Sequence, residues 1–249
     1  MNLTGLNLAS LMLIGSFVAG SSFALEPPPS PAPPPPPAPF FMPGPGTEGS
    51  SIPPVEKLAT GEYRLGEILV NKAQRSITFP AQVNMDSGLL EYLIVHNKGK
   101  THESLLRTLI DPYNLQIAFL LLGYEGAEQR LTRQGDPATP KGERIRITIS
   151  TVGGEKKSAA IPAEQWLVNK FGDEVKDVEP IVWVFSGSYV DQGRFLAQES
   201  GSIAAIWHDP VALIDNASPG GESNRIWYVK QGKVPPVGTP VNVTIRPAH

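Results

Sequence analysis

Apolar and polar residues alternate along residues 89–108 in a pattern that predicts a β-hairpin. A run of aliphatic and aromatic residues from Leu89 to Val95 is followed by the turn sequence Asn-Lys-Gly-Lys and by a second, partly apolar run. Gly99 in this turn is expected to supply the positive φ that tight hairpin turns require. We expect the two arms to pair in an antiparallel register and the rest of the chain to be organised around them.

A buried helix is predicted at about 111–122. Asp111 is a good N-cap, Pro112 suits the first helical position, and Gly123 suits a left-handed C-terminal cap. The residues between them are apolar nearly all round the helix, as in helices that are buried on several sides. This helix is therefore expected to pack on the hairpin at the centre of the core.

Most of the remaining elements are predicted strands. Residues 144–151 alternate Ile with charged or hydroxyl residues, which is typical of a half-buried strand, whereas 181–185 is a continuous apolar run typical of a strand buried on both faces. Further strands are expected at 68–70, 76–79, 157–161, 202–207, 226–229 and 241–245, and short helices at 163–168 and 211–214. The predicted fold class is α+β, a mostly antiparallel sheet packed on one buried helix, with one or two short helices besides.

The N-terminal part of the chain predicts export and a spacer. Residues 1–24 have an apolar core and end in Ser-Phe-Ala, the small-residue pattern that signal peptidase requires, although an uncleaved membrane anchor has the same pattern. Residues 25–56 form a proline-rich linker, expected to be disordered and to act as a tether or as a ligand for proline-binding modules. Residues 57–249 form the globular domain, in which 124–143 are a surface connection or a boundary between subdomains.

Charge and composition narrow the classes of function. The net charge is −3, and three acidic residues precede Lys57, so that the 21 bases from Lys57 onward are matched by an equal number of acids. A neutral domain without a basic run is not expected to bind nucleic acid. The chain has no cysteine, which excludes disulfides, a thiol nucleophile and an iron-sulfur cluster. No second apolar run long enough to span a membrane follows residue 24, so we expect a periplasmic or otherwise exported protein.

The hairpin register selects one candidate polar cluster. Side chains alternate between the faces of a strand, which places Tyr92, His96, Glu103 and Arg107 on the same face. A solvated face with weak ion pairs explains the same pattern. The register also directs His102 to the opposite face from Glu103, and it separates His102 from Ser104 and from Glu91 too far for a Ser-His-Glu triad.

Four residues rank second as functional candidates: His102, Ser186, Ser188 and His208. The two serines follow a buried strand and are more typical of turn residues than of nucleophiles. No metal or cofactor is expected, because the histidines lack the spacing that metal sites favour. No phosphate-binding loop and no Gly-x-Ser-x-Gly nucleophile elbow occurs, so any catalytic residue is unknown at this point.

Three motifs carry a resemblance to a known family. They are Gly-Lys-Thr-His-Glu-Ser-Leu-Leu at 99–106, Trp-Val-Phe-Ser-Gly-Ser at 183–188 and Pro-Val-Gly-Thr-Pro-Val from Pro236. Together they resemble the YdjY-type domain of exported bacterial proteins, over roughly residues 60–247. The resemblance implies a localisation outside the cytoplasm and a domain type, but no particular reaction. Some similar proteins carry cysteine-rich iron-sulfur segments, which this chain lacks.

Three functional hypotheses follow. The first is a non-catalytic binding or interaction module of the cell envelope, whose partner is an unknown envelope protein or ligand; the neutral, cysteine-free domain without catalytic signatures favours it. The second is a periplasmic hydrolase or transferase that uses the face of Tyr92, His96, Glu103 and Arg107. The third is a structural component of the envelope. Whether the protein is an enzyme is uncertain, and the absence of catalytic motifs favours the view that it is not.

Overall fold

The computed structural model describes residues 53–153 and 159–248. The predicted signal segment, most of the predicted linker and part of the predicted strand at 157–161 lie outside these residues. The first described strand, β1 (Val55–Lys57), begins two residues before the expected start of the globular domain. Among the described residues, no helix has both the length and the apolar character needed to cross a membrane.

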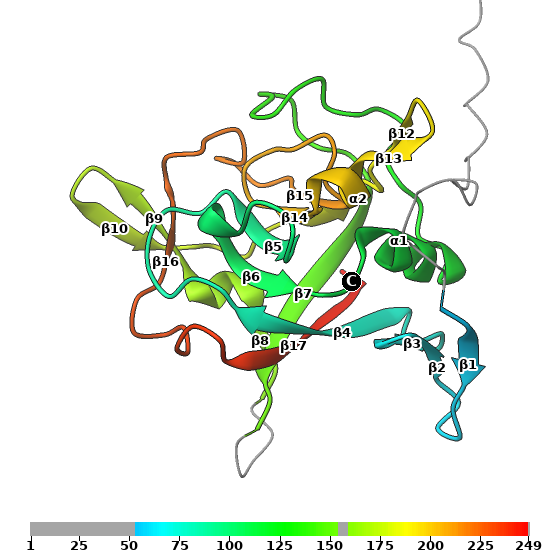
Figure 1. The fold of residues 1–249 in the computed structure, drawn as a ribbon. Coiled ribbons are helices and arrows are strands. Elements are labelled where there is room, and N and C mark those ends of the chain that lie inside the picture. The colour runs from blue at the N-terminus through cyan, green and yellow to red at the C-terminus, as the bar shows by residue number, and fades with distance from the viewer. Residues whose placement is uncertain (1–52, 154–158, 249) are drawn as a thin grey trace, which may run out of the picture. The chain divides into compact units, whose positions relative to one another are not determined.

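Eight strands form a closed barrel (Figure 1). Around the barrel their order is β4 (Ser76–Val83), β17 (Pro240–Pro247), β7 (Glu143–Thr151), β11 (Trp183–Phe185), β15 (Ile214–Asn216), β14 (Ser202–Ala205), β5 (Tyr92–His96) and β6 (Ser104–Thr108). The barrel closes because β6 pairs back with β4, through Gln82 opposite Arg107 and Val83 opposite Leu106. Most neighbouring strands are antiparallel, but β14 is parallel to β15 and β5 is parallel to β6.

The predicted α+β fold class is therefore wrong. The described chain is mostly β and contains only two α-helices, α1 (Pro112–Leu121) and α2 (Leu196–Ser200), so it is not a sheet packed on one helix. Local alternation identifies a strand and its buried face, but it carries no information about which distant strand pairs with it. The β4–β6 contact that closes the barrel is of this non-local kind.

Smaller elements extend the barrel. The strands β2 (Tyr63–Leu65) and β3 (Ile68–Asn71) continue the sheet from β4 to β1, and β8 (Ile161–Pro162) pairs with β7. Separate small sheets are formed by β10 (Glu174–Asp177), β9 (Leu167–Phe171) and β16 (Trp227–Val229), and by β12 (Val190–Asp191) and β13 (Arg194–Phe195). Two 3₁₀-helices are η1 (Thr101–Glu103) and η2 (Ala163–Trp166).

The hairpin predicted at 89–108 is also absent. Its two arms are β5 and β6, which lie side by side but run parallel, with Tyr92 opposite Ser104 and His96 opposite Thr108. The chain between them passes through η1 instead of a two-residue turn. Gly99 does not adopt a positive φ. A glycine is favoured at position 99 because its backbone packs against Gly201. A Cβ added to Gly99 would lie 3.0 Å from the carbonyl oxygen of Ser200.

The predicted helix at about 111–122 is present as α1, preceded by Asp111 and followed by Gly123 at a φ of +70°. It packs beside the barrel rather than at the centre of a sheet. The ring of Phe119 stacks on Phe185 of β11 at a centroid distance of 4.2 Å, and Tyr124 meets both rings edge-on. The helix expected at 163–168 is the 3₁₀-helix η2 followed by β9, and none forms at 211–214.

The barrel interior is filled by alternate residues of the long strands. In β7 these are the three isoleucines that the sequence pattern predicts to be buried, and β4 and β17 contribute the matching positions. The buried positions of the three strands are Ile77, Phe79, Ala81, Val83, Ile145, Ile147, Ile149, Val241, Val243 and Ile245. The residues between them face outward, so polar side chains on these strands line the outer wall.

The contact between α1 and the barrel can be tested with two residues of the same helix. Phe119 is fully buried, whereas Leu121 is 47% exposed. We expect Phe119→Ala to lower the free energy of unfolding by about 3–5 kcal/mol, because it leaves a cavity against Phe185. Leu121→Ala should change it by less than about 1 kcal/mol. Urea denaturation followed by circular dichroism measures both, and equal losses would contradict this account of the packing.

Candidate functional site

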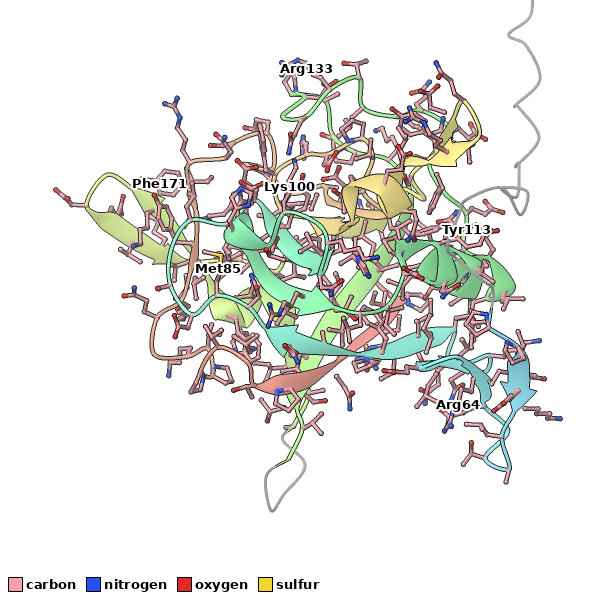
Figure 2. The ribbon with its side chains drawn as sticks, viewed as in Figure 1. Arg64, Met85, Lys100, Tyr113, Arg133 and Phe171 are labelled. Carbon is pink, nitrogen blue, oxygen red and sulfur yellow. The ribbon has the colours of Figure 1, made fainter. Side chains whose placement is uncertain are left out.

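A buried polar group is centred on Tyr92 of β5. Its hydroxyl donates to Oδ2 of Asp209 at 2.7 Å and accepts hydrogen bonds from Nζ of Lys100 at 2.7 Å and Nε2 of Gln134 at 2.9 Å. We call Tyr92, Lys100, Gln134 and Asp209 the Tyr92 network. Figure 2 shows Lys100 near η1, on the side of the barrel where the loop that carries Arg133 lies. Three segments distant in sequence thus meet at one phenol.

The electrostatics keep this phenol neutral. Tyr92 is fully buried, and burial is the main cause that raises its pKa, followed by the negative charge of Asp209 and the hydrogen bond to it. The ammonium of Lys100 also lies 4.9 Å from the centre of the ring. A tyrosine hydroxyl has one proton to donate and two lone pairs, and all of them are used here. The Tyr92 network can therefore fix three segments in place, but the hydroxyl has no free position for a ligand.

Behind Asp209 lies a second buried carboxyl, Asp215. It accepts the backbone N–H groups of Asp209 at 3.0 Å and Asn216 at 2.8 Å, and burial raises its pKa well above the usual value. Asp209, Asp215 and Ser186 line a cavity of about 10 Å³. A space of that size holds about one water molecule. Asp209 and Asp215 are thus part of the internal polar structure, with room for a solvent molecule rather than a substrate.

Glu103 and His102 do not lie where the predicted register places them. The imidazole Nε2 of His102 is 3.6 Å from Oε2 of Glu103, because residues 101–103 form η1 and do not alternate as in a strand. On its other side, Glu103 is hydrogen-bonded to the carboxyl of Glu91. Burial, and next the charge of Glu91, raise the pKa of Glu103, and Asn224 donates to Glu91 at 3.1 Å. The expectation that His102 and Glu103 point in opposite directions is therefore wrong.

Ser104 does not complete a triad with these groups. Its hydroxyl is buried and donates to the backbone carbonyl of Lys100 at 2.6 Å rather than to His102. His102 itself is 78% exposed. The arrangement is a pair of carboxyls with an imidazole at its exposed edge, and it lacks a hydroxyl nucleophile in contact with the imidazole.

The four residues of the predicted cluster have different partners. Tyr92 belongs to the Tyr92 network, and Glu103 is paired with Glu91. His96 is buried, its Nε2 lies 3.7 Å from Oδ1 of Asp111, and burial lowers its pKa. Arg107 donates to Oε1 of Gln82 from Nε at 3.3 Å and from Nη2 at 3.2 Å. The face that the hairpin register defined is not present as one site.

The second-rank candidates Ser186, Ser188 and His208 have structural roles. The hydroxyl of Ser186 donates to the carbonyls of Ala212 and Leu213, and that of Ser188 donates to Val211. The imidazole of His208 is buried, with Nδ1 2.6 Å and Nε2 2.8 Å from two backbone carbonyl oxygens. Within residues 53–153 and 159–248, no three His, Asp or Glu side chains are grouped so as to hold a metal ion.

Two larger pockets lie on the outer wall, each where a long strand changes its partner. Along one edge β4 pairs first with β3 and then with β6, and a pocket of about 460 Å³ lies there. We call it the β4 groove; it is lined by Glu67, Pro80, Ala81, Gln82, Asn97, Arg107, Thr108, Leu109 and Pro240. Along one edge β7 pairs with β11 and then with β8, and a second pocket of about 450 Å³ lies beside that change.

Sequence reasoning named Tyr92, Glu103 and Arg107, but it missed the residues that surround them. Lys100 was assigned to a turn, Asp209 to the start of a helix, and Gln134 to a surface connection. Asp209 does cap a local turn, since its Oδ1 accepts the N–H of Val211. The Asp-Pro sequence predicts this turn but not the contact of Asp209 with Tyr92. The contacts that join these residues are all long-range and have no local pattern.

Comparison with known proteins gives one match. The model of the YdjY domain family matches residues 68–246, which is most of the chain and nearly the whole described domain. No curated protein and no solved structure matches the sequence.

The Glu91–Glu103 pair predicts a pH dependence of stability. Because the pKa of Glu103 in the folded protein lies above its ordinary value of 4.5, the protonated carboxyl stabilises the fold at low pH, and this contribution is lost as the pH rises through the folded pKa. Glu103→Gln keeps the neutral hydrogen-bonding form at every pH. We therefore expect the variant to gain stability relative to the wild type as the pH is raised from 4 to 7.

Urea denaturation at a series of pH values measures this difference. Glu128→Gln is the matched control, because Glu128 is an exposed glutamate outside the pair. Its stability should follow that of the wild type across the series. Curves for Glu103→Gln and wild type that stay parallel at all pH values would contradict a raised pKa of Glu103 in the folded protein.

Proposed function

Because the chain belongs to the YdjY domain family, whose model covers residues 68–246, we propose that it is an exported binding module that holds a protein partner in the cell envelope. The observation that carries the proposal is Leu109, which is 74% exposed and is the most exposed of the large apolar side chains in the described residues. It lies at the β4 groove, one of the two large pockets of the outer wall. The apolar segment and small-residue site of residues 1–24 support export.

The surroundings of Leu109 have the composition of a protein interface. Proline and alanine side chains line the groove beside it, and Glu67, Gln82 and Arg107 supply polar groups. An apolar centre with a polar rim that includes an arginine is typical of surfaces that bind other proteins. Single exposed apolar residues are common on protein surfaces, but one that borders a groove of this size offers an anchor to a partner.

The backbone that carries Leu109 is held in place before any partner binds. Thr108 donates its hydroxyl to the carbonyl of Pro80 at 2.6 Å and accepts the N–H of Ile110 at 3.1 Å. Leu109 is therefore fixed between the end of β6 and the start of α1. Side chains on a rigid support lose less entropy on binding, which favours affinity.

The alternative of a hydrolase or transferase requires Tyr92, His96, Glu103 and Arg107 around one substrate. Their separate partners favour the binding proposal, because Tyr92 and Glu103 are held in internal contacts, His96 is buried beside Asp111, and only Arg107 lines the β4 groove. A structural role in the envelope, the third hypothesis, also relies on a protein contact. It differs in that the partner would be a permanent neighbour instead of a bound ligand.

Replacing Leu109 tests the proposal. We expect Leu109→Glu in the full exported chain to weaken partner binding by about 30-fold or more, because it places a charge at a desolvated contact. Leu121→Glu is the matched control, since Leu121 is an exposed leucine of α1 and does not line the groove. Chemical crosslinking in the envelope, followed by purification of each variant and quantification of the proteins bound, measures the effect.

The outcome decides whether the β4 groove is a binding surface. A protein recovered with the wild type and with Leu121→Glu, but not with Leu109→Glu, is the expected result. The same proteins recovered in equal amounts with all three would show that the β4 groove is not the binding surface.

A further inference from the structure

The second pocket of the outer wall lies where β7 lacks a partner on one edge. Residues 143–145 of β7 pair with β11, and Thr148 and Ile149 pair with β8. Neither strand reaches Arg146 or Ile147, although β17 pairs with both residues on the other edge. The pocket of about 450 Å³ is lined by residues on both sides of this interruption. It is thus built into the wall by strand pairing, and it contains none of the residues of the β4 groove.

Three arginines line this pocket, and we call it the arginine pocket. Arg146 on β7 lies directly opposite Arg246 on β17, and Arg144 precedes Arg146 by two residues and shares its face. Like charges directly opposite each other in an antiparallel pair destabilise it. In the described part of the chain, no ion pair or side-chain hydrogen bond engages any of the three guanidinium groups. The three arginines therefore place a concentration of positive charge at the pocket.

The acidic residue in the pocket, Glu164, does not compensate the three charges. It is half-buried, burial raises its pKa, and its carboxyl already accepts its own N–H and that of Ile181. The charge of Arg146 lowers the pKa of Glu164 only as the smallest of the causes. One carboxyl against three arginines leaves an excess of positive charge at the pocket.

The pocket also has an apolar wall. Pro162, Pro180 and Val182 line it, and none of the three is buried. The indole N–H of Trp183, also at the pocket, interacts with the carboxyl of Glu164 and favours its charged form.

We propose that the arginine pocket binds a small organic anion, with its phosphate or carboxylate group on Arg146, Arg246 and Arg144 and its apolar part against Pro180 and Val182. Arginine suits this role because its planar guanidinium donates two parallel hydrogen bonds to an oxyanion. An anion on the pair Arg146–Arg246 also removes their mutual repulsion. This site is separate from the β4 groove, so either proposal can fail without the other.

Titration of the full chain with three probes tests the site. The probes are inorganic phosphate, phenyl phosphate and benzoate, used at low salt and followed by isothermal titration calorimetry and tryptophan fluorescence. We expect phenyl phosphate to bind more tightly than inorganic phosphate, because only the former has an apolar part. Benzoate separates the two anion classes: tighter binding of benzoate than of phenyl phosphate assigns the site to carboxylates, and the reverse assigns it to phosphate esters.

Variants of the arginines identify where the probe binds. Arg146→Gln and Arg246→Gln should each weaken binding of the preferred probe by about tenfold or more, as expected for the loss of a charged hydrogen bond. Arg64→Gln is the matched control and should bind as the wild type does. Arg64 is an exposed strand arginine on β2, outside the barrel, and is labelled in Figure 2.

Thermal unfolding gives a second readout that does not depend on measuring affinity. Without anion, Arg146→Gln should unfold at a temperature equal to or higher than that of the wild type, because the opposed charges are gone. With the preferred probe at one fixed concentration well above its Kd for the wild type, the unfolding temperature should rise equally for the wild type and Arg64→Gln, and by clearly less for Arg146→Gln.

Several results would overturn the proposal. They are the absence of binding by all three probes at millimolar concentration, equal affinity of wild type, Arg146→Gln and Arg246→Gln, and an equal loss of affinity in Arg64→Gln. The last of these would show a general effect of surface charge.

Discussion

The closed barrel depends on one short contact, the pairing of β4 with β6. Two residue pairs make it, and without them β6 would be an open edge able to pair with another chain. The contact is reinforced by side chains, since Arg107 donates to Gln82 and Thr108 donates to the carbonyl of Pro80. Pro80 lies where β4 has left β3 and has not yet reached β6. A proline is tolerated there because neither β3 nor β6 pairs with this position, so no ladder hydrogen bond needs its missing N–H.

The same strand lengths that close the barrel create its pockets. β7 has nine residues and β4 has eight, whereas their neighbours β11, β8 and β3 have three, two and four. A long strand beside short ones must change partners, and the wall is incomplete at each change. The β4 groove and the arginine pocket are the two places where this happens. Surface features that could take a partner therefore follow from the sheet topology.

The elements that could be predicted from the sequence are those with a local cause. The alternation at 144–151 and at 241–245 locates β7 and β17 and their buried faces, and Asp111, Pro112 and Gly123 locate α1. The relation between β5 and β6 could not be predicted in this way, because an apolar strand before and after a glycine turn is typical of a hairpin. Here Gly99 serves a close approach to Gly201, about a hundred residues away, and the strands run parallel. Which partner a strand takes is decided by contacts that no local pattern records.

The candidate site shows the same division. Tyr92 and Glu103 were predicted to share a face from the hairpin register, which the structure does not have. They are near each other because η1 follows β5. The charge of Glu103 is one of the causes that raise the pKa of Tyr92. Lys100, Gln134 and Asp209 reach Tyr92 from three segments whose sequences indicate only turns or loops. A polar residue at a predicted strand position indicated which side chains make structural contacts, but it could not identify the residues that they contact.

The distribution of unused polar groups decides where a ligand is best accommodated. In the Tyr92 network every donor and acceptor of the phenol has a partner, so a ligand would have to displace a bond that also holds the fold together. Ser186, Ser188 and His208 are committed to backbone carbonyls in the same way. In the arginine pocket, by contrast, Arg146 and Arg246 are opposite each other in the strand register and three arginines share the lining with one acid, so an anion would reduce an excess of positive charge. A polar group whose hydrogen bonds stabilise the fold cannot exchange its partner for a ligand without a loss of stability. Neighbouring like charges, by contrast, are stabilised when an anion binds. The outer wall is therefore the better place for a ligand.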